Sequence, residues 1–182
     1  AGRAVEILLD EEEVPFNFTS IKTMMASSLL ISDTRTSQQT RIDAPGPHIS
    51  TKEYDRFHRK MRQIYPRPDL IVAGGSVPPG VPVDIYYGLI MEDKDFGVRT
   101  ILDSEGIWLE EGLKAKPYLI KPNIREVEEF LKMELPTEEA IAKAALSLVE
   151  MHAEIVVISR GRDGIIVATK DRIFKVVPPL VK

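Results

Sequence analysis

From residue 50 onward, short runs of isoleucine, valine and leucine alternate with longer segments whose apolar residues recur at helical spacing. The runs predict strands over residues 69–75, 98–103, 118–121, 154–159, 164–170 and 173–177. The segments between them predict helices over residues 50–65, 83–95, 105–113, 123–133 and 137–151. This alternation is typical of an α/β domain with a mostly parallel sheet, closed here by an antiparallel pair. Because the strand runs are almost continuously apolar, we expect helices on both faces of the sheet.

The N-terminal part of the chain follows a different pattern. Residues 1–12 predict the end of an amphipathic helix, and residues 16–19, 28–32 and 39–43 predict short strands. The cluster Ala44–His48, rich in proline and glycine, is a candidate hinge. Both ends of the chain lack the polar, frayed character of most termini, so we expect the sequence to be part of a longer domain.

Composition argues against several classes of function. The chain has no cysteine, which removes disulfides, thiolate zinc sites and cysteine nucleophiles. The net charge of -4 and the even spread of basic residues argue against nucleic-acid binding. No apolar run is long enough to span a bilayer, and the acidic residues 10–13 do not fit a signal peptide. We therefore expect no membrane contact and a cytoplasmic location.

Ligands of parallel α/β sheets bind beyond the carboxyl ends of the strands, so the residues that follow each predicted strand matter most. Gly74 and Gly75 end the first strand, and Ser76 follows it. The glycines either let a ligand approach the backbone or only shape a tight turn, and Ser76 adds a hydroxyl. Asp103 ends the second strand, where a carboxylate can orient a magnesium-bound water or cap the next helix.

The third and fourth strand ends suit anions. Lys121 can meet a phosphate, while Asn123 and Glu126 stand at the two positions of a capping box. This spacing is that of an ordinary helix start, but a helix N-terminus also favours anions, and Glu126 can reach a hydrated magnesium ion. The segment Ser159–Gly164 is either a tight connection between strands or a nest of backbone N–H groups that binds an anion.

Together and in this order, these motifs resemble those of the PfkB branch of the ribokinase-like kinases, particularly its 1-phosphofructokinase and tagatose-6-phosphate kinase members. Gly74–Gly80 is similar to that group's Ser-Gly-Ser-Leu-Pro-Pro-Gly, and Leu109–Asn123 is similar to its signature sequence. The segment Ser159–Gly164 matches its Ser-x-Gly-x-x-Gly nucleotide turn. P-loop and Gly-x-Gly-x-x-Gly sequences are absent, which disfavours P-loop kinases and Rossmann dehydrogenases.

The resemblance implies a ribokinase-like α/β fold in which residues 16–43 are part of a small β lid and residues 1–15 and 44–182 are part of the large domain. It implies transfer of the ATP γ-phosphate to a hydroxyl of a sugar or sugar phosphate, with magnesium. The sugar would lie at Gly75 and Ser76, the water-bound metal at Asp103 and Glu126, and the nucleotide along Lys121, Asn123, Ser159, Gly161 and Gly164. In such kinases the lid often joins two subunits, so we expect a homodimer through the lid.

The sequence departs from this family in two places. The Gly-Ala-Gly-Asp motif, whose aspartate is the catalytic base, is absent and would be expected just after Lys182, so we expect the chain alone to be inactive. The lid arginine that grips a substrate phosphate would fall near Met25 and Ala26, and Arg35 lies too close to Pro45 to replace it. A non-catalytic relative that binds nucleotide or sugar, and a structural interaction fragment, are the alternatives.

Overall fold

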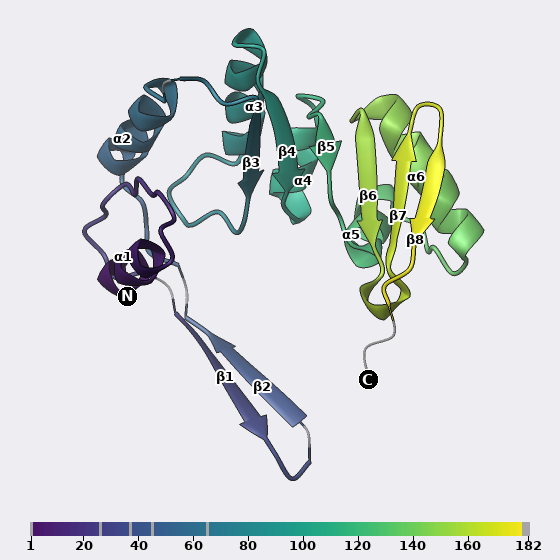
Figure 1. Ribbon diagram of the computed structural model, residues 1–182, viewed down its shortest axis with the longest axis horizontal. Helices are drawn as coiled ribbons and strands as arrows, with labels where there is room; N and C mark the ends of the chain where they lie inside the picture. Colours follow the sequence, from purple (N-terminus) through teal and green to yellow (C-terminus); the bar gives the residue numbers. More distant parts are fainter. Residues whose placement is uncertain (1, 26, 37, 45, 65, 180–182) are drawn as a thin grey trace. The chain divides into compact units, whose positions relative to one another are not determined.

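The structure, a computed structural model, describes residues 2–25, 27–36, 38–44, 46–64 and 66–179 (Figure 1). Contacts divide the chain into two compact units, Ala1–Ile64 with Pro78–Val81 and Tyr65–Val77 with Pro82–Lys182. The second unit contains the sheet on which the predicted site residues lie. Across the described residues, no helix has the length and apolar character needed to cross a membrane.

The second unit is built on one mixed sheet. In spatial order its described strands are β3 (Leu70–Gly74), β4 (Arg99–Asp103), β5 (Leu119–Ile120), β6 (Ile155–Ser159), β7 (Ile165–Thr169) and β8 (Ile173–Val176). Neighbours from β3 to β6 pair in parallel, whereas β7 pairs antiparallel with both β6 and β8. The predicted architecture, a mostly parallel sheet that ends in antiparallel strands, is confirmed.

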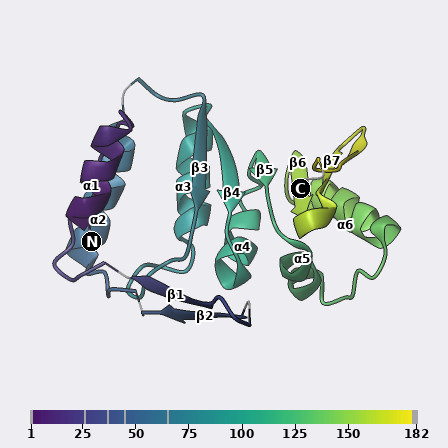
Figure 2. The same cartoon turned by 60° about the horizontal axis from the view of Figure 1, so that its bottom comes forward.

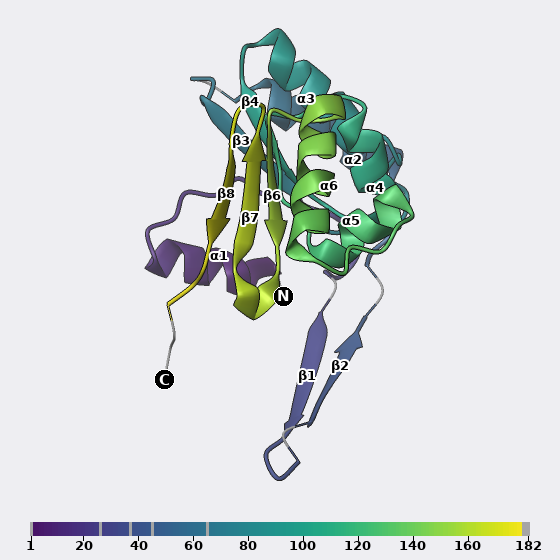
Figure 3. The same ribbon diagram turned by 90° about the vertical axis from the view of Figure 1, so that its right-hand side faces the viewer.

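Helices α3 (Ile85–Asp95), α4 (Gly106–Leu113), α5 (Ile124–Leu131) and α6 (Glu138–Met151) alternate with these strands and lie on the same face of the sheet (Figure 3). The prediction of helices on both faces is therefore wrong for the described part of this unit. Along β6, Val156 and Ile158 are buried on the helix side, whereas Ile155 and Val157 are only half-buried. A continuous apolar run shows that both faces of a strand are apolar, but it does not say what covers each face.

The face under the helices forms the hydrophobic core. Its fully buried side chains include Leu102, Ile120, Leu148, Ile158 and Ile166. Burying one such side chain contributes about 1.5–3 kcal/mol to folding. One polar contact is buried with them: the Thr100 hydroxyl on β4 donates to Asp93 of α3 at 2.7 Å, so this carboxylate is not left unpaired.

The first unit contains helices α1 (Gly2–Glu11) and α2 (Thr51–Arg62) and a hairpin of β1 (Ser28–Asp33) and β2 (Gln38–Asp43). The capping box predicted at Ser50 and Glu53 is present, and Glu53 also accepts a hydrogen bond from the Lys22 amide at 2.8 Å. The strand predicted over residues 16–19 is absent. That segment is held by side chains of α2 instead of a neighbouring strand, since the Lys60 ammonium donates to Asn17 at 2.8 Å.

The β1–β2 hairpin stands apart from the other elements of its unit (Figures 1 and 3). Every residue of both strands is exposed. Leu29, Leu30 and Ile31 remain 57%, 56% and 50% exposed although they are large and apolar. A two-stranded hairpin without a covering surface is only marginally stable in water, so this one lacks the packing that stabilises the larger sheet.

Candidate functional site

The carboxyl ends of β3, β4, β5 and β6 follow one another along a single edge of the sheet, which Figure 2 brings toward the viewer. Gly74 at the end of β3 pairs with Asp103 at the end of β4. Lys121 directly follows β5, and two residues later Asn123 forms a parallel bridge to Ser159 of β6. The structure thus brings the predicted residues of all four strand ends onto the same edge, while the role of each remains a prediction.

At the end of β3, the backbone of Gly74 passes close to the backbone of Asp103 at the end of β4. A Cβ atom at Gly74 would lie 2.7 Å from the Asp103 carbonyl oxygen, so a larger residue does not fit. Gly75 has φ of 96° and donates its N–H to the same carbonyl at 3.1 Å. Ser76 follows this anchored turn and is exposed. The glycines therefore do shape a turn, and the turn leaves the Ser76 hydroxyl accessible to a ligand.

Sequence reasoning missed Tyr86, which holds this turn from α3. Its hydroxyl donates to the Gly75 carbonyl oxygen at 2.9 Å, and its side chain is buried. Burial raises the pKa of the Tyr86 hydroxyl, and the charge of Asp103 acts in the same direction. Tyr86 therefore remains a hydrogen-bond donor at neutral pH. The only hint in the sequence is a residue with an apolar ring and a polar tip, near the start of the helix that follows the glycines.

Asp103 and Lys121 form an ion pair across the ends of β4 and β5. The Lys121 Nζ atom lies 3.1 Å from Asp103 Oδ1, and both side chains are about half exposed. Ion pairs this exposed contribute about 0–1 kcal/mol. An anion that reaches this edge can therefore draw Lys121 away from Asp103 at little cost in stability.

Asn123 and Glu126 form the predicted capping box at the start of α5. The Asn123 side chain accepts the Glu126 amide at 3.0 Å, and Glu126 accepts the Asn123 backbone amide at 3.0 Å as well as its side-chain amide. Burial raises the pKa of the Glu126 carboxyl, and the negative charges of Glu105 and Asp103 add to this, against the Asn123 hydrogen bond and the Lys121 charge. The box accounts for both residues as a helix start, and it leaves a partly buried carboxylate beside Asp103 and Lys121.

The segment after β6 forms a short 3-10 turn, η1 (Gly161–Asp163). Gly161 and Gly164 have φ of 57° and 86°, which side-chain-bearing residues rarely adopt. The Arg160 amide donates to the Gly164 carbonyl at 2.8 Å, and the Asp163 and Gly164 amides donate within the same turn. Among the described residues, the amides of Gly161 and Arg162 have no acceptor. If the segment binds an anion, as predicted, these two N–H groups are the ones within the turn that remain available to it, and the nest itself stays a prediction.

Asp103 and Glu126 suit a magnesium ion that is held mainly by other groups. No cluster of three or more His, Cys, Asp or Glu residues able to hold a metal occurs in the described ranges of the chain. Magnesium, however, usually keeps several waters and binds through one or two carboxylates together with substrate phosphates. Two neighbouring carboxylates next to a cationic edge fit that mode of binding and do not form a complete metal cage.

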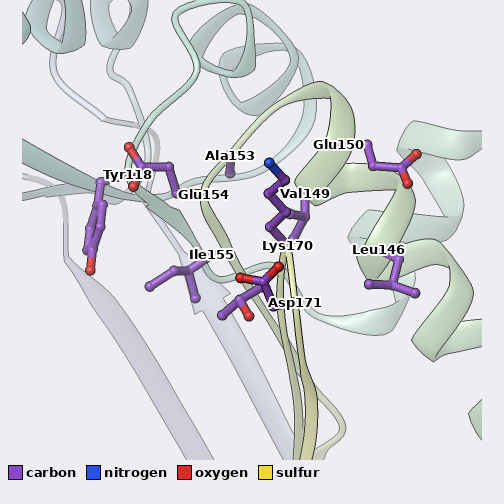
Figure 4. A pocket seen from close by; sticks show the side chains of 10 residues that line it. Tyr118, Leu146, Val149, Glu150, Ala153, Glu154, Ile155, Lys170 and Asp171 are labelled. Carbon is purple, nitrogen blue, oxygen red and sulfur yellow. The ribbon is translucent and has the colours of Figure 1, made fainter.

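A pocket of about 770 Å³ lies at the other end of the same sheet (Figure 4). Tyr118 precedes β5, Glu154 precedes β6, and Lys170 and Asp171 form the turn after β7. The side chains of Leu146 and Glu150 on α6 complete one wall (Figure 4). None of the predicted site residues lines this pocket, so it is separate from the edge that carries the strand-end motifs.

The family model of the pfkB carbohydrate kinases matches the chain over residues 1–182. The chain belongs to the pfkB carbohydrate kinase family. The proteins to which it is similar include the tagatose-6-phosphate kinase of Staphylococcus epidermidis, at 31% identity over all of this chain and 59% of that protein. The D-tagatose-1-phosphate kinase of Bacillus licheniformis is 33% identical over 96% of this chain and 56% of its own length. The chain thus spans somewhat more than half the length of these relatives.

The fold agrees with that of a solved phosphofructokinase structure. Phosphofructokinase-2 from Escherichia coli in complex with fructose-6-phosphate superimposes with a TM-score of 0.91 and 30% identity, covering all of this chain and 60% of that one. This match confirms the ribokinase-like α/β fold expected from the motifs. It covers both units of this chain, including the β1–β2 hairpin.

Two features expected of pfkB sugar-phosphate kinases are not found in this sequence. No Gly-Ala-Gly-Asp motif occurs. The position expected for the lid arginine lies near Met25, which is exposed, and Ala26, which is outside the described residues. Arg35 lies in the turn of the hairpin, where its amide donates to Asp33 at 2.8 Å.

Proposed function

We propose that this chain is part of an ATP-dependent kinase that transfers the γ-phosphate to a hydroxyl of a sugar or sugar phosphate. The observation that carries the proposal is the single edge on which Gly75, Asp103, Lys121 and Ser159 follow one another. In phosphoryl transfer, catalysis consists mainly of positioning the two substrates and neutralising phosphate charge. An edge with an exposed hydroxyl, that of Ser76, at one end and a cationic part with available N–H groups at the other suits both tasks.

The nucleotide would bind the half of the edge that follows β5 and β6. Lys121 and Asn123 would contact its phosphates, and Ser159, Gly161 and Gly164 would lie along it. Lys121 suits this role because its ion pair with Asp103 is half exposed and is exchanged cheaply for a phosphate. Asp103 and Glu126 would hold magnesium through water, and the ion, when bound, neutralises phosphate charge.

The sugar would bind at the other half of the edge, against Gly75 and Ser76. Relatives are named as kinases of tagatose 6-phosphate, tagatose 1-phosphate and fructose phosphates, which makes a phosphorylated ketohexose the substrate class we propose. No arginine lies near Met25, where such kinases would grip the substrate phosphate. Lysine or a neutral residue does not reproduce the bidentate contact of an arginine, so the substrate phosphate would be held here without that contact.

Deprotonation of the acceptor hydroxyl is the step for which these residues supply no group. Lys121 and the turn glycines offer donors, the neutral side chain of Asn123 is used in its capping box, and Asp103 and Glu126 would be engaged with the metal. We therefore propose that this chain by itself binds substrates without turning them over. The alternative is a natural, non-catalytic relative. The coding sequence downstream of Lys182 distinguishes the kinase from the non-catalytic relative. Codons for Gly-Ala-Gly-Asp there would support the kinase, and a nearby stop codon would support the binding protein.

The hairpin would join two copies of the chain. Its exposed Leu29, Leu30 and Ile31 form an apolar strand that lacks a covering surface among the described residues. Such strands are stabilised by pairing or packing with another chain. A homodimer through this lid should dissociate when Leu30 is replaced by lysine, measured by sedimentation velocity, and a monomeric wild-type chain would contradict it.

The deciding experiment is calorimetric titration of the chain with ATP and magnesium. We expect saturable binding that is lost in Lys121→Ala and in Gly161→Val, because valine is strained at φ of 57°. Lys114→Ala is the matched control, since Lys114 is also an exposed lysine but pairs with Glu111 at 2.6 Å beside α4. Equal binding by all four proteins would place the nucleotide elsewhere, and no binding by the wild type would leave this edge without its proposed ligand.

A further inference from the structure

One carboxylate outside the predicted site joins the Ser159–Gly164 turn to two other elements. Glu138, the first residue of α6, accepts from Arg160 Nη1 at 3.0 Å and from Lys175 Nζ at 2.7 Å, both through its Oε2 atom. Arg160 belongs to the turn, and Lys175 belongs to β8. Glu138 therefore links the start of a helix, the turn after β6 and the last described strand.

Arg160 is the residue through which the turn is held. Its amide donates to the Gly164 carbonyl at 2.8 Å, and its own carbonyl accepts the Asp163 amide at 3.1 Å, so it closes the turn at both groups. Its side chain is only 11% exposed, in contrast to the 46% of Glu138 and the 47% of Lys175. A guanidinium that is nearly buried depends on its carboxylate partner much more than an exposed one does. The position of the Arg160 backbone is thus coupled to Glu138.

The turn is also packed tightly against β8. A Cβ atom at Gly164 would lie 2.0 Å from the carbonyl oxygen of Val176, the residue after Lys175. By holding Lys175 with the same oxygen that holds Arg160, Glu138 fixes both sides of this contact. The two turn amides that have no acceptor in the described part of the chain, those of Gly161 and Arg162, lie between these anchors.

We propose that Glu138 is a positioning residue for nucleotide binding, which acts through Arg160 to hold the Gly161 and Arg162 amides where a phosphate or ribose oxygen can accept from them. The inference rests on the proposed function, because it takes the turn to be part of a nucleotide site. Glu138 itself does not touch the nucleotide. Its carboxylate orients the turn, as an outer group orients a residue that binds a ligand directly.

The neighbouring glutamate offers a matched control. Glu139 lies in the same first turn of α6, is also exposed, and experiences the same favourable end of the helix dipole. Glu138→Gln and Glu139→Gln remove the same charge from the same helix turn, but only the first disrupts the contacts to Arg160 and Lys175. Any effect that Glu138→Gln has and Glu139→Gln lacks therefore belongs to those contacts.

The test combines calorimetric titration with ATP and magnesium, titration with fructose 6-phosphate, and hydrogen exchange of the turn amides. We expect Glu138→Gln to weaken ATP binding about three- to fivefold, the scale of one partly exposed ion pair, and to speed exchange at the Arg160 amide. Affinity for the sugar phosphate should not change, because the Gly75–Ser76 turn is at the other end of the edge. Glu139→Gln should behave as the wild type in all three measurements.

A double-mutant cycle separates positioning from general destabilisation. If Glu138 acts through Arg160, Glu138→Gln should weaken ATP binding no further in a protein that already carries Arg160→Gln. Fully additive losses, equal losses of ATP and sugar-phosphate affinity, or unchanged ATP affinity in Glu138→Gln would each overturn the inference. A wild type that binds no ATP would instead overturn the proposed nucleotide site, and with it the inference. The exchange measurement then still reports whether Glu138 orders the turn.

Discussion

Two nearly equivalent apolar runs in this chain have opposite surroundings. Ser28–Ser32 reads Ser-Leu-Leu-Ile-Ser in β1, and Ile155–Ser159 reads Ile-Val-Val-Ile-Ser in β6. Ile31 is 50% exposed, whereas Ile158 is fully buried. Strand β6 lies between β5 and β7 under α5 and α6, while β1 pairs with β2 alone among the described strands. Strand character is therefore local, but burial depends on what the rest of the fold supplies.

The same contrast holds for the two units as a whole. The buried hydrophobic side chains of the described chain all fall between Ala73 and Ala168, in the second unit. In the described part of the first unit, the one buried residue is Glu53, which accepts hydrogen bonds from Ser50 and Lys22. The second unit is stabilised by apolar packing, and the first by a few polar contacts. The following predictions test that difference, from the largest expected effect to the smallest.

Truncating a leucine to alanine in each of the two sheets should lower the free energy of unfolding by very different amounts. Leu102→Ala in β4 should lower the free energy of unfolding by about 3 kcal/mol, because it leaves a cavity in a packed core. At protein concentrations low enough to keep the chain monomeric, Leu30→Ala in β1 should change it by about 0.5 kcal/mol or less, since that side chain is 56% exposed in the single chain. Urea unfolding followed by the fluorescence of Trp108, the single tryptophan, gives the first value, and circular dichroism gives both. Similar losses in the two variants would contradict the contrast.

Close backbone packing should distinguish two glycines of the same turn. Gly164→Ala should cost about 3 kcal/mol, because its φ of 86° is strained for alanine and the new Cβ would meet the Val176 carbonyl at 2.0 Å. Gly161→Ala should cost only about 1 kcal/mol, because it has positive φ but nothing within 4 Å. Thermal unfolding measures both. Equal losses of stability in the two variants would mean that the close contact between the turn and β8 is not what excludes a larger residue at position 164.

Acid should weaken the first unit through Glu53. Hydrogen bonds from the Ser50 hydroxyl and amide and from the Lys22 amide lower the pKa of Glu53 to about 2 from its ordinary 4.5. A carboxyl with a lowered folded-state pKa stabilises fully above its unfolded pKa, and this contribution is lost as the pH falls from 4.5 through about 2. The protection of the Tyr54 amide against exchange, relative to the intrinsic rate at each pH, should therefore fall in that window, and Glu53→Gln should lower this protection already at pH 7.

In the second unit, the pKa of Glu126 is raised instead of lowered, so its ionisation has the opposite effect on stability. Because burial raises the pKa of Glu126, its ionisation disfavours the folded state above its ordinary pKa. Glu126→Gln keeps a side chain suited to the capping box and should leave exchange at Val127 unchanged or slower at pH 7. Faster exchange at Val127 in this variant, comparable to that at Tyr54 in Glu53→Gln, would show that both carboxylates stabilise their helices alike.

The smallest effect should come from an exposed ion pair in the stable unit. Arg125 and Glu129 are 3.0 Å apart on α5, with side chains 86% and 59% exposed. Arg125→Gln should lower the free energy of unfolding by about 0.3 kcal/mol, as for other helical pairs in water. The measurement is the urea midpoint at low and high salt. A loss as large as that of Leu102→Ala would mean that burial is not what separates the strong contacts from the weak ones.

The sequence predicted most elements and the edge on which the candidate site lies. Alternating apolar runs place strands and helices because their spacing is a local property of the chain. In a parallel sheet, the carboxyl ends of neighbouring strands must meet at one edge, so Asp103, Lys121 and Ser159 could be grouped before any coordinates. Capping boxes at Ser50 and Asn123 were equally predictable, since both partners are within three residues of each other.

Contacts between distant residues were decided only by the tertiary structure. The sequence has no local signal for the hydrogen bond from Tyr86 to Gly75, or for the ion pairs that Arg160 and Lys175 make with Glu138, because packing alone brings these partners together. It likewise did not show that helices cover only one face of the described sheet, or that residues 16–19 are held by α2. In the second unit, the sequence by itself determined which residues form strands and which groups end them, since both follow from local spacing. Which apolar faces are covered, and which side chains hold the binding turns, depends on free energies of packing that no short segment contains.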